Sequence, residues 1–166
     1  TPIFARHIRK NIKSKNIICV APDVGGTERA RALGKLLDVG LAIVDKRRPA
    51  PGKSQVMNVI GNVKGKTCIL VDDIIDSGGT IVNAAKALKD RGAKDVYVYI
   101  THGVLSGDAI NKIKKSIIKK LVITDTIDNL GKTNKAKNIE VLSISNLMAE
   151  AIKRISNSTS VSDLFK

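Results

Sequence analysis

Residues 68–80 read CILVDDIIDSGGT, and this stretch decides the fold that the sequence predicts. Its first four residues are apolar, as in a strand that is buried on both faces of a parallel sheet. Two adjacent carboxylates, Asp72 and Asp73, then end the strand, and Asp76 leads into the small-residue turn 77–80. A strand of the core does not need such an ending. An acidic strand end followed by a glycine turn is typical of a ligand site.

On both sides of this stretch, apolar runs alternate with segments of helical periodicity, which indicates βαβ units. We therefore predict one α/β domain over residues 1–166, a three-layer fold in which helices cover both faces of a parallel sheet. The predicted strands are 17–21, 41–45, 68–71, 96–101, 121–124 and 139–143. The predicted helices are 27–38, 80–91, 107–119 and 145–155, together with one that opens at Thr1-Pro2.

Side-chain spacing predicts which faces are buried. Phe4, Ile8 and Ile12 recur at helical spacing in the first helix, and the stripe 110, 113 and 117 is expected to face inward from helix 107–119. Residues 46–58 show no periodicity and carry four cations, so we expect a mobile basic loop there. The tail 156–163 is rich in serine and precedes Leu164-Phe165, a pair able to dock back on the domain.

Composition excludes several classes of protein. No run of 18 uncharged apolar residues occurs, and no secretory signal is evident, so neither a membrane partner nor secretion is expected. The two cysteines lie inside strand-like runs, which favours buried thiols in a reducing, cytoplasmic compartment. The net charge of +14 is spread along the chain without interleaved aromatic residues. We interpret it as solvated helix faces that favour anionic small substrates, not as a nucleic-acid interface.

The residues after strand 68–71 have the chemistry of a sugar-phosphate site. Ligands of open parallel sheets bind beyond the carboxyl ends of the strands, where Asp72 and Asp73 can accept hydrogen bonds from vicinal hydroxyls or help hold Mg²⁺. Glycines let the following loop tighten, and amides at a helix start form a phosphate cradle. The alternative is an ordinary strand–turn–helix junction with exposed acids. Arg29 and His102 lie near strand ends or helix starts, but such residues are more often structural, and neither is included in the predicted site.

Two further motifs narrow the interpretation. APDVGG at 21–26 follows the first strand, and DKRRP at 45–49 follows the second. With YITHGVLSGDAI and SVSDLF, the chain from about Ile3 to Phe165 closely resembles the ribose-phosphate pyrophosphokinase family. The stretch 68–80 resembles the phosphoribosyl-pyrophosphate-binding motif of the type I phosphoribosyltransferase fold.

The resemblance implies transfer of the β,γ-pyrophosphoryl group of ATP to ribose 5-phosphate, with Mg²⁺ as cofactor. It implies that Asp72 and Asp73 hold the ribose hydroxyls, and that Asp23 contributes to the metal–sugar site. The implied phosphate-binding residues are Asp76, Ser77, Gly78, Gly79 and Thr80. Lys46 and Arg48 match the catalytic basic pair of the family, and Ser160 and Ser162 match a segment that joins a regulatory phosphate site.

Family members have two homologous halves, and this chain resembles only the second. We therefore expect a homo-oligomer or a complex with the absent N-terminal half, and weak activity without it. Two alternatives stay open: a phosphoribosyltransferase that uses phosphoribosyl pyrophosphate, and a non-catalytic subunit associated with a complete synthetase. The intact acids and basic pair argue against a decayed site.

Overall fold

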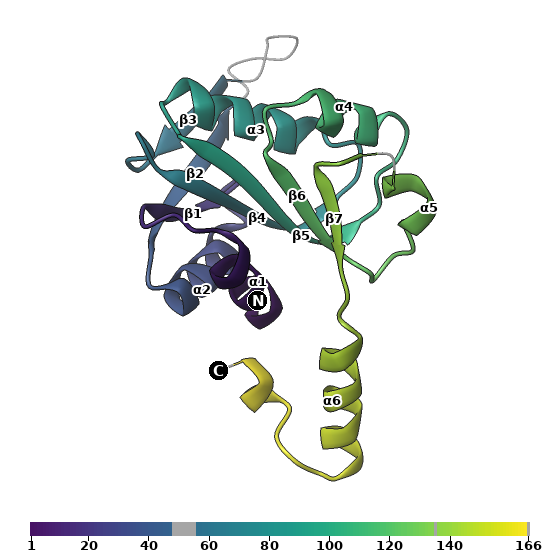
Figure 1. The fold of residues 1–166 in the computed structure, drawn as a ribbon. Helices are drawn as coiled ribbons and strands as arrows, with labels where there is room; N and C mark the ends of the chain where they lie inside the picture. The colour runs from purple at the N-terminus through teal and green to yellow at the C-terminus, as the bar shows by residue number, and fades with distance from the viewer. Residues whose placement is uncertain (48–55, 135, 166) are drawn as a thin grey trace.

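The structure, a computed structural model, describes residues 1–47, 56–134 and 136–165. Its strands form one seven-stranded sheet in the order β3-β2-β1-β4-β5-β6-β7 (Figure 1). They are β1 (Ile17–Ala21), β2 (Gly40–Arg47), β3 (Val56–Ile60), β4 (Thr67–Ile75), β5 (Asp95–Gly103), β6 (Lys120–Thr124) and β7 (Ile139–Leu142). Every neighbouring pair is parallel except β2 with the edge strand β3. The predicted α/β class is confirmed.

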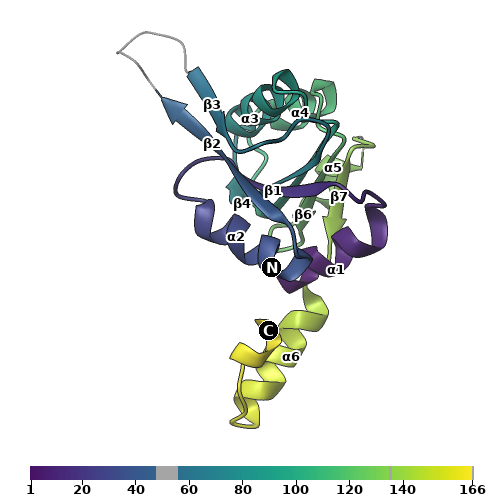
Figure 2. The same cartoon turned by 90° about the vertical axis from the view of Figure 1, so that its left-hand side faces the viewer.

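Helices cover both faces of this sheet, as predicted. α1 (Pro2–Asn11) and α2 (Thr27–Leu37) lie on one face, whereas α3 (Gly79–Asp90) and α4 (Ala109–Lys115) lie on the other (Figures 1 and 2). The short α5 (Leu130–Thr133) lies beside β7. Crossovers between parallel strands are right-handed. The connection from β1 to β2 and the connections from β4 to β6 progress in opposite directions across the sheet, so their helices cover opposite faces.

The core has two parts, one on each face of the sheet. The larger lies under α3 and α4 and includes Leu70, Leu88 and Ile113. The smaller lies under α1 and α2, where the ring of Phe4 meets that of Tyr99 edge-on at 5.4 Å between centroids. Aliphatic residues dominate both parts, as expected for a chain with 2% aromatic residues. The predicted stripe of α1, formed by Phe4, Ile8 and Ile12, is buried.

The prediction of a loop over 46–58 is wrong at both of its ends. Lys46 and Arg47 continue β2, and residues 56–58 begin β3, in the antiparallel register Lys46↔Met57 and Arg47↔Val56. Residues 48–55 lie outside the described residues. A short edge strand next to proline and glycine has a weak local signal, and pairing with β2 is a tertiary contact that a pattern search does not detect.

The predicted helix 107–119 is shorter in the structure. α4 ends at Lys115 because Ser116 adopts an extended conformation and its hydroxyl donates to the Ile113 carbonyl at 2.7 Å. The Ser116 hydroxyl also accepts the Ile118 amide at 3.2 Å. Ile117 is consequently exposed, and the expectation that it faces inward is wrong.

The C-terminal segment leaves the body of the domain. α6 (Ser145–Ser156) projects from the end of β7, and the 3₁₀ turn η1 (Ser162–Phe165) folds back beside it (Figure 1). Arg154 of α6 contacts this returning segment, since its guanidinium donates to the Ser160 carbonyl at 2.8 Å and lies 3.9 Å from the Asp163 carboxylate in η1. The end of the tail, which the sequence suggested could dock on the domain, lies beside α6 instead, and Phe165 is 53% exposed (Figure 1). None of the described helices is long and apolar enough to cross a bilayer.

Candidate functional site

The carboxyl ends of β1 and β4 form the site. These strands are neighbours, but the chain leaves β1 toward β2 on one side and β4 toward β5 on the other. The two following helices, α2 and α3, therefore lie on opposite faces. A crevice opens between the loops at such a switch point, and ligands of open α/β sheets bind there.

A hollow of about 270 Å³ occupies this position. It is lined by Asp23, Asp72, Ile74, Ile75, Asp76, Ser77, Gly78, Gly79, Thr80 and Ile81. The hollow thus brings together every residue of the predicted phosphate turn, one acid of the pair at the end of β4 and the acid that follows β1. Asp73 is not part of its lining and lies beside it, with a side chain that is 55% exposed.

The phosphate turn presents an uncapped helix start to the hollow. Gly78, the N-cap of α3, has a φ of 77°, a left-handed conformation that favours glycine. No side chain caps α3, so the first amides of the helix have no partner from a capping group. The Nζ of Lys112 lies 3.4 Å from the Ser77 carbonyl and adds a positive charge near the turn. Amides and a positive helix end favour an anion here.

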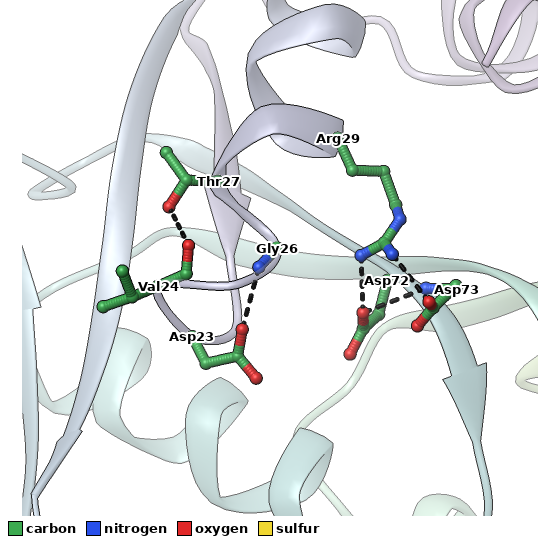
Figure 3. Close-up of polar contacts among 7 residues, drawn as sticks. All are labelled: Asp23, Val24, Gly26, Thr27, Arg29, Asp72 and Asp73. Carbon is green, nitrogen blue, oxygen red and sulfur yellow. Dashed lines mark hydrogen bonds and ion pairs between the residues drawn. The ribbon is translucent and has the colours of Figure 1, made fainter.

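The loop after β1 orients Asp23. Its Oδ1 accepts the backbone N–H of Gly26 at 2.9 Å, and the Thr27 hydroxyl donates to the Val24 carbonyl at 2.7 Å (Figure 3). A Cβ at Gly26 would lie 3.3 Å from Pro22 and 3.6 Å from a guanidinium nitrogen of Arg29. The glycine therefore allows a close approach between this loop and the first turn of α2.

Arg29 bridges the two carboxylates at the end of β4. Its Nη1 donates to Asp72 Oδ1 at 2.9 Å and its Nη2 to Asp73 Oδ2 at 2.7 Å (Figure 3). Asp72 Oδ1 also accepts the backbone N–H of Asp73 at 2.9 Å. Sequence reasoning left Arg29 out of the site. Its position in the first turn of a helix behind a glycine pair was the available signal, but its partners lie 43 and 44 residues further along the chain.

Opposing effects act on the pKa of Asp72 in the acid pair. Burial, together with the neighbouring Asp73, raises the pKa of Asp72 from 3.8 to about 6. The backbone N–H of Asp73 and the Arg29 guanidinium oppose this rise. At neutral pH the carboxylate is therefore ionised, although with a smaller margin than an exposed aspartate has. Ionised oxygens at this edge can accept hydrogen bonds from sugar hydroxyls or contact a cation.

Comparison with known proteins identifies the family of this chain. A family model described as the phosphoribosyl synthetase-associated domain matches residues 46–166. The chain belongs to this family. It is 57% identical over 164 residues to the ribose-phosphate pyrophosphokinases of Rhizobium meliloti and of Brucella melitensis, covering 99% of this chain and 53% of each relative.

Two solved structures have a fold similar to that of this chain. The phosphoribosylpyrophosphate synthetase of Mycobacterium smegmatis is 34% identical, with a TM-score of 0.82 over 94% of this chain and 50% of that protein. An adenine phosphoribosyltransferase, 20% identical with a TM-score of 0.55, shares the fold alone. The chain spans about half the length of the synthetases that it resembles.

Four other residues of the predicted site do not line the hollow, and one of the four lies outside the described residues. Lys46 lies in β2, and Arg48 falls outside the described residues. The hydroxyls of Ser160 and Ser162 are 2.9 Å apart in the tail beside α6. His102, which the prediction excluded, is not in the lining, and its Nδ1 lies 3.0 Å from the Thr126 hydroxyl.

Proposed function

We propose that this chain is the ribose 5-phosphate-binding half of a ribose-phosphate pyrophosphokinase. The activity proposed for the complete enzyme transfers pyrophosphate from ATP to ribose 5-phosphate, giving phosphoribosyl pyrophosphate and AMP for nucleotide biosynthesis. One observation carries the proposal: the uncapped start of α3 and the carboxylates at the ends of β1 and β4 line one hollow at the switch point of the sheet.

Different residues of the site are proposed to bind the phosphate and the sugar of the substrate. The turn 76–80 would hold the 5-phosphate, because its amides and the Ser77 and Thr80 hydroxyls are donors that suit phosphate oxygens. The sugar would extend from the hollow across Asp72 toward Asp73, whose carboxylates accept from hydroxyl groups. Binding in this pose would fix the anomeric hydroxyl for attack. Phosphoryl-type transfer depends on such positioning and on charge neutralisation.

Lys46 and Arg48 are proposed to supply that neutralisation. In this assignment they meet the negative charge on the transferred pyrophosphoryl group and on the departing AMP. Support comes from the sequence resemblance and from the course of the chain, since β2 is the neighbour of β1 and ends with Lys46 and Arg47. The role of Arg48 depends on the resemblance alone.

The acids of the hollow suit Mg²⁺. No three His, Cys, Asp or Glu side chains of the described residues gather into a metal-binding group. Mg²⁺ in phosphoryl-transfer sites usually keeps several waters and binds one or two carboxylates together with substrate phosphates, so a complete protein cage is not required. We assign this contact to Asp23, whose Oδ1 is oriented by the Gly26 amide. The ion would neutralise charge on the phosphates of ATP.

Several partners follow from the proposal. ATP and ribose 5-phosphate are the substrates, and the companion half or further copies of the enzyme complete the ATP site. The chain alone should therefore show weak turnover or none. Ser160 and Ser162 remain proposed members of a regulatory phosphate site. The two unpaired, buried cysteines support the proposed cytoplasmic location, because thiols stay reduced there.

Calorimetry of the full chain tests the proposal. With Mg²⁺ present, we expect ribose 5-phosphate to bind, and Asp73→Ala or Thr80→Ala to weaken binding about tenfold each, because each removes a hydrogen bond to a charged or hydroxyl group. Asp90→Ala, which removes an exposed acid from the far end of α3, should leave binding unchanged. Absence of binding by the folded wild-type chain would contradict the proposal.

A further inference from the structure

The bridging geometry of Arg29 is the observation that the proposed mechanism does not use. Its two terminal nitrogens each donate to a different carboxylate, so one guanidinium spans two neighbouring acids (Figure 3). Each acid gives one oxygen to Arg29, namely Asp72 Oδ1 and Asp73 Oδ2. The backbone N–H of Asp73 also donates to Asp72 Oδ1, the same oxygen of Asp72 that Arg29 contacts.

We propose that Arg29 is a positioning and specificity residue, which holds two carboxylates side by side so that the site selects a phosphorylated sugar with two vicinal hydroxyls. The inference rests on the proposed function for the identity of the sugar phosphate. It adds the role of Arg29, which positions the two acids that the proposed function assigns to the sugar hydroxyls. Arg29 itself need not touch the sugar.

Electrostatics explain why the acids need a third group. Two adjacent carboxylates at the end of one strand repel each other, and like charges next to one another resist being ionised together. The rigid, planar guanidinium fork offsets this repulsion and fixes one oxygen of each acid at 2.9 and 2.7 Å. Arg29 also lowers the pKa of Asp72 against the effects of burial and of Asp73, which keeps the acid an acceptor.

The charged groups around the pair come from three elements. Arg29 belongs to α2, Asp23 follows β1, and Asp76 follows β4 in the phosphate turn. Only Arg29 is a cation that contacts the pair among the described residues. The phosphate turn should bind the phosphate group of any sugar 5-phosphate equally well. Asp72 and Asp73, held in place by Arg29, distinguish sugars by their hydroxyl groups. A site built to bind a hydroxyl rejects the analogue that lacks it, because a polar group is then left unpaired.

A comparison of two sugars tests this role. We would measure Kd by calorimetry for ribose 5-phosphate and 2-deoxyribose 5-phosphate, with Mg²⁺, at a pH well above the pKa of Asp72. The wild-type chain should prefer ribose 5-phosphate about tenfold, the loss expected for one hydrogen bond to a charged acceptor. Arg29→Met should remove most of this preference and leave the Kd of the deoxy sugar nearly unchanged.

Two further variants sharpen the result. Arg29→Lys should restore the preference only in part, because an ammonium group cannot hold both carboxylates as a fork does. Arg31→Met, which removes an exposed arginine two residues further along α2, is the matched control and should behave as wild type. Circular dichroism would verify that each variant folds.

The outcomes separate this inference from the proposed function. If the wild-type chain binds neither sugar phosphate, the proposed function is wrong. If it binds both but Arg29→Met weakens both equally, keeps the preference or tightens ribose 5-phosphate binding, the proposed function stands and the role given to Arg29 is wrong. Loss of the preference in Arg29→Met but not in Arg31→Met supports the inference.

Discussion

At the scale of single residues, the partly buried carboxylate of Asp72 in the binding site lowers the free energy of unfolding when it is ionised. Its side chain is 19% exposed, and burial contributes most to raising its pKa from 3.8 to about 6. A folded-state pKa above the unfolded value means that the native chain binds more protons between these two pH values. Ionised Asp72 therefore lowers the free energy of unfolding. This cost is absent below about pH 4 and fully present above about pH 6.

The Asp72→Asn variant tests this reading of the acid. Near neutral pH we expect it to raise the free energy of unfolding by about 1 kcal/mol, because the amide carries no charge to desolvate and the remaining solvent exposure moderates the gain. Below about pH 4 the difference should vanish, since wild-type Asp72 is then protonated as well. Urea denaturation at both pH values provides the measurement. A gain of equal size at both would show that the charge of Asp72 is not its cause.

At the scale of elements, the junction between β4 and α3 determines the site. The strand carries its acids to the edge of the sheet, and the turn reverses direction through Gly78 before α3 begins. A Cβ at Gly78 would make only ordinary contacts, the nearest being Ile113 Cδ1 at 3.7 Å. The requirement for glycine therefore comes from the backbone angle and not from crowding.

Gly78→Ala should separate the backbone cost from the binding function. We expect it to lower the free energy of unfolding by about 1–2 kcal/mol, the cost of a left-handed conformation for alanine, and to weaken ribose 5-phosphate binding by displacing the amides. Gly65→Ala is the matched control, because Gly65 has a φ of 70°, open space at its Cβ and no part in the hollow. Equal effects of both variants on binding would contradict the role of the turn.

At the scale of the whole molecule, α6 differs from the other long helices. It contributes no buried residue within the described chain, and Met148, Ile152 and Ile155 are exposed on it. By contrast, α3 buries four apolar residues against the sheet. Hydrophobic side chains stabilise a fold only when they leave water, so the apolar residues of α6 add little to the stability of this domain.

Ile152→Lys and Ile113→Ala make the contrast measurable. Ile152 is 63% exposed, and its replacement should change the free energy of unfolding by less than about 0.5 kcal/mol. Ile113 belongs to α4 and is fully buried in the larger part of the core, so its truncation should cost about 3 kcal/mol. Thermal unfolding at several protein concentrations provides the test. A large, concentration-dependent loss in Ile152→Lys would show that copies of the chain bury α6 in solution.

The sequence predicted the α/β architecture of the domain better than it predicted where individual strands and helices begin and end. Buried strands and amphipathic helices have periodicities that act within a few residues, so the apolar start of β4 and the stripe of α1 were recognised directly. The prediction that Asp72 and Asp73 end this strand is wrong, because β4 continues through both acids to Ile75 by pairing with β5. The strand β3 was missed because its stability comes from pairing with β2. The end of α4 was misplaced because the Ser116 hydroxyl, not a glycine or proline, stops the helix.

The sequence by itself determined the α/β class, the turn that presents amides to an anion, and the acids at the strand ends, because hydrophobic periodicity and turn chemistry are local. The tertiary structure alone decided that the turn 76–80 and Asp23 line the same hollow, and that Arg29 bridges Asp72 and Asp73. These contacts join residues about forty or more positions apart. They form only when α2 packs on the sheet and β1 pairs with β4, and no local pattern encodes that arrangement.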